Sequence, residues 1–306
     1  MTTPFPFSLI TVLSTWALLI IGGLVNPMGA SMACPDWYFF PTCNGEILPV
    51  MEGGVLYEHG HRLVATIVGI STSILTFLCW RTPGVSRLTK RLCLLALLLV
   101  VLQGTLGGIT VLLNLSALVS TLHLACAMIF FSLLIYISFR LSPDWKPVRA
   151  FDKSLMALLI AILLTLGQLV YGGVVRHMGA GLACGDDLIG CGPEIWPSWF
   201  YGQLHMGHRF LGYAIFFVVL YACIKARKFA VSNGDKLAAS LSLLPVFITF
   251  CQIGLGLMAI YTVRSPSVLA MHTGFGALLL ASLLAVYLMQ LQANHVPTLL
   301  HGQVSN

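Results

Sequence analysis

The chain has 306 residues, of which 58% are hydrophobic and only 8% are charged, with a mean hydropathy of +0.92 and a formal net charge of +6. A soluble domain has about a quarter of its residues charged, so this composition excludes a soluble globular protein and indicates a membrane protein. The basic residues lie in short loops and form no basic face with interleaved aromatic residues, which excludes nucleic-acid binding.

Apolar segments of about 20 residues, long enough to cross a hydrocarbon core of about 30 Å, occur eight times. We therefore predict an all-α polytopic membrane protein with eight transmembrane helices. The predicted spans are 8–26, 61–80, 91–112, 117–139, 154–175, 205–224, 238–261 and 267–290. The first segment has no preceding basic region, so we expect a retained helix and not a signal peptide.

The loops after the second, fourth and sixth segments concentrate the positive charge. They contain 12 of the 16 Lys and Arg residues: Arg81, Arg87, Lys90, Arg91, Arg140, Lys146, Arg149, Lys153, Lys225, Arg227, Lys228 and Lys236. Since basic loops stay in the cytoplasm, both termini are predicted to be cytoplasmic, and the loops near 27–58 and 176–204 to face outward.

The second half of the chain repeats the first at an offset of about 150 residues, with three landmarks in the same order. These are GGLVNPMGASMAC (22–34) with GGVVRHMGAGLAC (172–184), His61-Arg62 with His208-Arg209, and Gln103/His123 with Gln252/His272. We predict two tandem, pseudo-symmetric four-helix bundles, residues 1–145 and 146–306, related by an axis along the membrane normal.

Each half has one histidine at the outer end of its second helix and one near the outer end of its fourth, namely His61 with His123 and His208 with His272. Polar groups inside a membrane are costly and are therefore candidates for function. Two imidazoles that face each other across a bundle suit haem iron, whereas zinc and copper typically take three or four ligands. The alternative is a packed imidazole that is bonded to a neighbouring carbonyl.

Other residues near these histidines fit a haem pocket. Arg62 and Arg209 could pair with haem propionates, or simply extend to the membrane interface. His59 and His177 are further candidates for propionate contact, or ordinary loop residues. Four glycines would let a flat ring approach the backbone, or serve helix packing: Gly207, Gly212, Gly274 and Gly276.

The halves differ three residues before the first histidine, where Glu58 stands in one and His205 in the other. Residues three apart share a helix face, so Glu58 is expected beside His61, where a carboxylate can act as acid, base or electrostatic stabiliser. We predict that the N-terminal half performs chemistry and that the C-terminal half holds a permanent cofactor. An ion pair between Glu58 and Arg62 is the alternative.

The outer loops contain two cysteine pairs, Cys34 with Cys43 and Cys184 with Cys191. The outer side of a bacterial membrane is oxidising, so one disulfide in each loop is permitted, although spacing alone does not establish the bond. A structural role and a redox-active role are both open.

Eight spans, duplicated "HR" motifs, paired distal histidines, two outer cysteine pairs and the Glu58 position together resemble the heme A synthase family. The resemblance implies oxidation of the C8 methyl of haem O to a formyl group, which yields haem A for terminal oxidases. It further implies that His208 and His272 ligate haem b and that His61 and His123 flank haem O. Glu58 would then be the catalytic carboxylate.

The resemblance also implies a bacterial inner membrane protein. The candidate partners are the lipid bilayer, haem O, the haem O farnesyltransferase, an electron acceptor and a second copy of the chain. The rival functions are a bis-His dihaem electron carrier and a haem transporter or chaperone, neither of which gives Glu58 a task. The sequence departs from the family in three places: His59, the lack of a glutamine in the first helix to match Gln168, and the loop at 185–194.

Overall fold

The computed structural model describes residues 4–37, 41–147 and 150–292. These residues are helical, apart from loops with two isolated bridges, Cys43–Glu46 and Cys191–Glu194. The helices are α1 (Pro4–Val25), α2 (Gly53–Arg81), α3 (Arg87–Leu112), α4 (Ala117–Leu141), α5 (Lys153–His177), the 3-10 turn η1 (Ala180–Leu182), α6 (Phe200–Ser232), α7 (Lys236–Leu241), α8 (Leu244–Tyr261) and α9 (Pro266–Gln292).

Within the described ranges, eight helical segments are long and apolar enough to cross a membrane, which confirms the predicted all-α, polytopic fold. The seventh span consists of α7 and α8 with a break at Ser242 and Leu243. Pro245 lies in the first turn of α8, where it has no N–H to continue the hydrogen bonds of α7.

At the outer side, α2 and α6 begin well before their predicted spans, at Gly53 and Phe200. Their outer turns are rich in polar residues, which a hydropathy criterion assigns to loops. In the structure Glu58 of α2 is buried and accepts the N–H of Cys34, and Gln203 of α6 donates to the Pro197 carbonyl in the preceding outer loop. The helices therefore continue beyond the apolar segments, because the protein itself supplies partners for the polar side chains.

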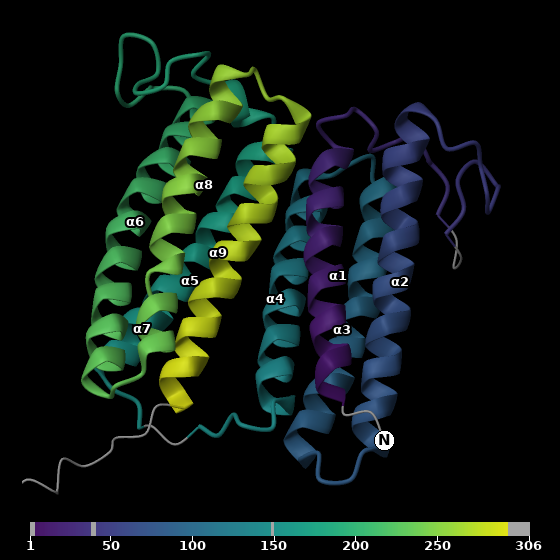
Figure 1. Cartoon of the computed structure of the whole chain (residues 1–306). Coiled ribbons are helices and arrows are strands. Elements are labelled where there is room, and N and C mark those ends of the chain that lie inside the picture. The colour runs from purple at the N-terminus through teal and green to yellow at the C-terminus, as the bar shows by residue number, and fades with distance from the viewer. Residues whose placement is uncertain (1–3, 38–40, 148–149, 293–306) are drawn as a thin grey trace, which may run out of the picture.

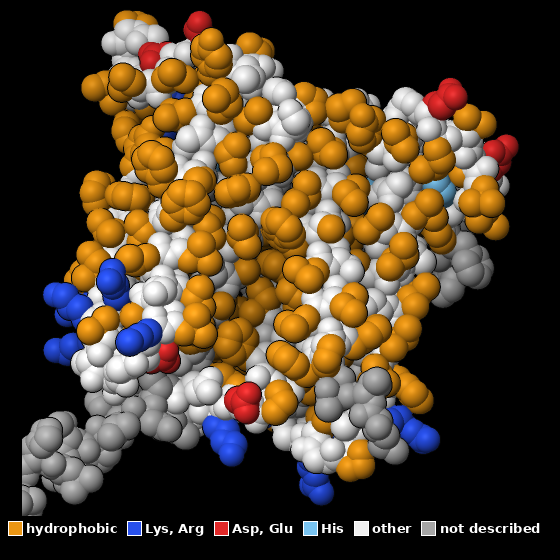
Figure 2. All heavy atoms as spheres, viewed as in Figure 1, with side chains coloured by type: hydrophobic (Ala, Val, Ile, Leu, Met, Phe, Trp, Pro, Cys, Tyr) orange, Lys and Arg blue, Asp and Glu red, His pale blue; other side chains and the backbone are white. Residues whose placement is uncertain are grey.

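Apolar side chains cover the sides of the bundle, as Figure 2 shows for one face. In hydrocarbon every backbone polar group must be satisfied within the protein, which a continuous helix achieves. Lys and Arg side chains gather at the end that contains the loops before α3 and α7, while the loops with the cysteine pairs lie at the other end. The basic loops thus share one end of the bundle, and their location in the cytoplasm remains a prediction. Arg149 lies outside the described residues.

The two halves have the same internal packing, with α1 against α2 and α4 in one, and α5 against α6 and α9 in the other (Figure 1). The halves meet through α1 against α9 and α4 against α5. Thus α1, α4, α5 and α9 form a central layer, as a parallel repeat requires. The assignment of separate tasks to the two halves remains a prediction.

Small residues and tryptophan hydrogen bonds join the halves. A Cβ atom at Gly274 of α9 would lie 2.6 Å from Ile20 Cγ1 of α1, so only glycine allows this approach. Trp16 Nε1 donates to the Gly274 carbonyl at 2.9 Å, and Trp145 Nε1 donates to the Leu288 carbonyl at 3.0 Å. Close backbone approach and interhelical hydrogen bonds are the main attractions between helices in lipid.

Candidate functional site

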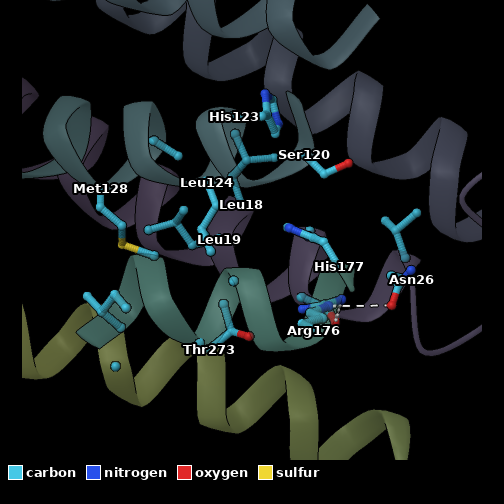
Figure 3. A pocket seen from close by; sticks show the side chains of 18 of the residues that line it. Leu18, Leu19, Asn26, Ser120, His123, Leu124, Met128, Arg176, His177 and Thr273 are labelled. Atoms are coloured by element: carbon cyan, nitrogen blue, oxygen red, sulfur yellow. Dashed lines mark hydrogen bonds between the residues drawn. The ribbon is translucent and has the colours of Figure 1, made fainter. Parts of the chain in front are cut away.

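A cavity of about 1170 Å³ extends through both halves and across the central layer. Its lining includes all four predicted ligands, His61, His123, His208 and His272. Sites for a single small molecule usually occupy about 300–1,000 Å³, so this cavity is larger than most such sites. Figure 3 shows the part of the cavity between His123 and the end of α5.

Each of the four imidazoles packs over a glycine of another helix in its own half. The pairs are Gly22–His61, Gly107–His123, Gly172–His208 and Gly256–His272. A Cβ atom at these glycines would lie only 2.9–3.3 Å from the imidazole Cε1, closer than ordinary van der Waals contact. The glycines therefore let each ring lie against a neighbouring backbone.

The glycines that the sequence singled out contact other residues than the four imidazoles. A Cβ at Gly207 would collide with the Tyr171 hydroxyl, and one at Gly276 with Leu169. Gly212 and Gly274 likewise contact residues of neighbouring helices, so these glycines take part in helix packing. Gly212 and Gly276 also line the cavity, and their approach to a flat ring stays a prediction. The ring-supporting glycines were missed, although Gly22 and Gly172 hold equivalent places in the repeated segment.

The four imidazoles have no hydrogen bond at either ring nitrogen among the described residues, and each Nδ1 is buried. The other described histidines all use a nitrogen. His59 bonds to the Ile47 carbonyl at 3.1 Å, His177 to Thr121 Oγ1 at 3.0 Å, and His205 accepts from Arg209 Nε at 3.3 Å. His59 therefore anchors an outer loop, whereas the four predicted ligands are free to bind something else.

The two imidazoles of each predicted pair belong to the same half and line the same cavity. The imidazoles of His61 and His123 are close enough to interact electrostatically, as are those of His208 and His272. No group of three or more His, Cys, Asp or Glu side chains with the spacing of a metal site occurs in the described part of the chain. Paired imidazoles without a third ligand suit haem iron better than zinc or copper.

A glutamine amide on another helix of the same half donates to the backbone carbonyl of three of the four histidines. The bonds are Gln103 to His123 (2.9 Å), Gln168 to His208 (2.7 Å) and Gln252 to His272 (2.9 Å). His61 has no such bond, because Leu18 occupies the place that Gln168 takes in the repeat. The carbonyl of His61 is therefore the least constrained of the four.

Glu58 is only 5% exposed and lines the cavity beside His61. Its Oε1 forms an ion pair with Arg62 Nη2 at 2.8 Å, and its Oε2 accepts the N–H of Cys34 at 2.9 Å. Arg62 also donates to the carbonyls of Cys34, Asp36 and Thr42. The ion pair considered in the sequence is thus present, and it fixes the carboxylate at the cavity wall.

Arg209 binds the second outer loop in the same way, through Nη1 to the carbonyls of Asp187 (2.9 Å) and Gly190 (3.1 Å). Its Nη2 is buried with no hydrogen-bond partner in the described structure. Both Nη atoms of Arg62 are used, so the two propionate candidates differ. Arg209 has a free buried donor at the cavity, whereas Arg62 mainly holds its loop.

The structure contains both disulfides, Cys34–Cys43 and Cys184–Cys191, with Cα atoms 4.6 and 4.4 Å apart. In each loop the second cysteine donates its N–H to a glutamate carbonyl three residues later, at 2.8 Å. The unusual sequence at 185–194 therefore folds much like the first loop.

An aspartate organises each disulfide loop. Burial alone would raise the pKa of Asp36, but the N–H groups of Gly45 and Asn44 and the Thr42 hydroxyl donate to its carboxylate and hold the pKa below its usual value. Asp187 accepts N–H bonds from Gly190, Ile189 and Gly192, which lower the pKa of its carboxyl. Each carboxylate thus replaces the missing backbone partners of a tight loop.

Comparison with known proteins supplies the decisive observation. A family model described as cytochrome oxidase assembly protein matches residues 6–284. Heme A synthase from Bacillus licheniformis is 30% identical over 227 residues, which cover 72% of this chain and 74% of that protein. The chain belongs to the heme A synthase family of cytochrome oxidase assembly proteins.

Further relatives align over almost the whole chain. Heme A synthase from Geobacillus kaustophilus is 27% identical, over 95% of this chain and 92% of its own length. Heme A synthase from Lysinibacillus sphaericus is 28% identical over 91% of this chain and 92% of its own length. Family membership therefore concerns both halves of the chain, including both histidine pairs and both disulfide loops.

Proposed function

We propose that this protein is a heme A synthase, an oxidoreductase that converts the C8 methyl group of haem O to a formyl group. The observation that carries the proposal is the contrast among the histidines. Four imidazoles line one cavity without any hydrogen bond to the described protein, and a buried carboxylate stands beside only one of them. Family membership supports the same reaction.

The C-terminal half would hold haem b through His208 and His272. The residues fit this group, because both imidazoles are unengaged and the buried Nη2 of Arg209 lacks an acceptor that a propionate would provide. Haem b, when bound, supplies reversible one-electron chemistry. Gln168 and Gln252 fix the backbone at both ligands, as suits a permanently bound cofactor.

The N-terminal half would hold the substrate, haem O, between His61 and His123. Glu58 is fixed at the cavity wall by Arg62 and by the Cys34 N–H, so it needs little reorganisation when charge develops nearby. A carboxylate held in this way can stabilise positive charge at the edge of the substrate or accept a proton from its reacting group. The C-terminal half has His205 in this place, and so lacks the carboxylate.

Replacement of the carboxylate tests the proposal. In cells that make haem O, the Glu58→Gln variant should lose at least about tenfold in haem A formation, because a general acid–base group contributes about 10²–10⁴-fold. Haems extracted from the purified protein and separated by chromatography provide the measurement. Glu52→Gln, at the exposed residue immediately before α2, is the control. Undiminished haem A from the Glu58→Gln variant would favour an electron carrier or a haem transporter.

The cofactor assignment has its own test. His208→Ala and His272→Ala should each lose the low-spin haem b absorption of the purified protein, because one axial ligand is removed. His61→Ala should keep this absorption, since it alters only the substrate pocket. Unchanged haem b in both C-terminal variants would refute the assignment.

We also propose that the protein lies in the bacterial inner membrane with both termini in the cytoplasm. The basic loops gather at one end, and the disulfide loops at the other, where an oxidising compartment would maintain them. A membrane-impermeant thiol reagent applied to intact cells should label Leu48→Cys, in the first outer loop, and not Leu237→Cys, beside the basic loop. Both positions are exposed.

A further inference from the structure

The cavity passes between the halves at the end of α5, where Arg176 and His177 line it (Figure 3). Although both residues belong to the C-terminal half, Arg176 bonds to α1, through Nη2 to the Gly23 carbonyl at 3.0 Å and through Nε to Asn26 Oδ1 at 3.5 Å. The C-terminal half thus brings a guanidinium to the wall of the N-terminal pocket.

His177 makes the corresponding contact with α4. Its Nδ1 lies 3.0 Å from Thr121 Oγ1, two residues before His123, and its imidazole interacts electrostatically with that of His123. When the Thr121 hydroxyl donates to Nδ1, the hydrogen of the neutral imidazole is at Nε2, which has no hydrogen bond in the described structure. His177 then offers a donor to a ligand of the N-terminal pocket.

The charges around Arg176 are unbalanced. Its described hydrogen-bond acceptors are a neutral carbonyl and a neutral amide, and its Nη1 has none. Its charged neighbour is a second cation, Arg264, in the loop before α9. Among the described residues, the ion pair at the cavity is between Glu58 and Arg62, and it does not involve Arg176. A half-buried guanidinium with another cation close by is costly unless an anion joins it.

This arrangement occurs once in the molecule. The repeat places Asn26 and Pro27 where the second half has Arg176 and His177, and Leu115 where it has Arg264. If Arg176 and His177 served only to join the halves, the same residues could occur at the equivalent positions of both halves. The glycines and glutamines that contact the histidines largely do so. The asymmetry instead indicates a task at one of the two sites.

We propose that Arg176 and His177 form a carboxylate-binding site that holds a propionate of the haem in the N-terminal pocket. This inference rests on the proposed function, since it takes the ligand between His61 and His123 to be a haem. The guanidinium and the imidazole would supply charge-assisted hydrogen bonds to the two oxygens of one carboxylate. The substrate would thereby be oriented by residues from both halves.

The proposal is tested by comparing the binding of haem, whose propionates are free, with that of haem dimethyl ester, whose propionates are blocked. Purified full-length protein with its C-terminal haem retained is titrated with haem and with its dimethyl ester, and the absorption change at the N-terminal pocket is followed. Arg176→Gln and His177→Asn should weaken binding of the free acid by about tenfold, as loss of a charge-assisted hydrogen bond predicts, and leave binding of the ester unchanged. Arg227→Gln, exposed on α6 beside a basic loop, removes the same charge as a control.

Several outcomes would overturn the inference. If Arg176→Gln binds the free acid as tightly as the wild type, the carboxylate site is refuted. If free acid and ester weaken equally, Arg176 only joins the helices, and the inference is again wrong. If the His61→Ala variant gives the same haem titration as the wild type, the titrated haem does not bind beside His61. That outcome would refute the substrate pocket of the proposed function, and the carboxylate site with it.

Discussion

The four predicted ligands illustrate what single residues contribute. Their residue type and their duplication in the sequence indicated haem, but a histidine at such a place can equally be bonded to a carbonyl. The structure distinguishes these cases, because His59, His177 and His205 use a ring nitrogen within the protein and the four ligands do not. A hydrogen bond between distant side chains depends on packing, which the sequence does not reveal.

The glutamine at the backbone of a ligand can be tested directly. Gln168→Leu places in the C-terminal half the leucine that stands at the equivalent position, Leu18, in the N-terminal half. It removes the 2.7 Å hydrogen bond to the His208 carbonyl. We expect haem b to dissociate about 3–10-fold faster, the loss expected from one hydrogen bond. The rate of haem transfer to an excess of apomyoglobin provides the measurement.

The reverse substitution serves as the matched experiment. Leu18→Gln should slow haem loss from the N-terminal pocket, because an amide that donates to the His61 carbonyl would then steady His61 as well. Equal dissociation rates in the wild type and in Gln168→Leu would show that the amide does not restrain the ligand.

At the scale of elements, the outer loops and the helices below them form one unit in each half. Arg62 and Arg209 rise from α2 and α6 and bind loop carbonyls, so the arginines that the sequence assigned to propionates also fix the loops. These bonds fix each outer loop to the helix below it. Hydropathy could not predict them, since the partners are backbone atoms of loops with different sequences.

The stability of the second disulfide loop should depend on pH through the carboxylate of Asp187. Because N–H donors lower the pKa of this carboxyl in the folded loop, its stabilising effect is complete above the ordinary value of 3.8 and is lost as the pH falls through the lowered pKa. We expect Asp187→Asn to lower the Tm at pH 7, with the difference from the wild type disappearing in strong acid. Thermal unfolding of the detergent-solubilised protein as a function of pH measures this.

The neighbouring Asp186 offers a control, since no hydrogen bond to its side chain occurs in the described structure. Asp186→Asn should leave the Tm unchanged at both pH values. A Tm difference for Asp187→Asn that persists unchanged in strong acid would contradict the role of its carboxylate.

The whole molecule depends on the central layer of α1, α4, α5 and α9. This layer places the two histidine pairs at one continuous cavity and brings Arg176 and His177 from one half to the pocket of the other. The repeat in the sequence predicted two similar bundles, but it did not predict which faces meet.

Gly274 provides a test of this layer. Gly274→Leu would push a side chain into Ile20 of α1 and should destabilise the protein by about 1–3 kcal/mol, the usual cost of overpacking. We expect a lower Tm and faster loss of both haems. Gly254→Leu, at an exposed glycine whose Cβ would meet nothing within 4 Å, should leave both unchanged. A Tm for Gly274→Leu equal to that of Gly254→Leu would contradict the predicted packing.

The sequence by itself determined the eight spans, the duplication and the residue types of the candidate site, because hydropathy, charge asymmetry and repeated motifs are local properties of the chain. Tertiary structure alone decided that Glu58 accepts the N–H of Cys34, that Gly22, Gly107, Gly172 and Gly256 support the imidazoles, and that Arg176 reaches the opposite half. These contacts join segments far apart in the chain, and they depend on how helices pack and on which backbone atoms remain free. No periodicity or spacing records such contacts.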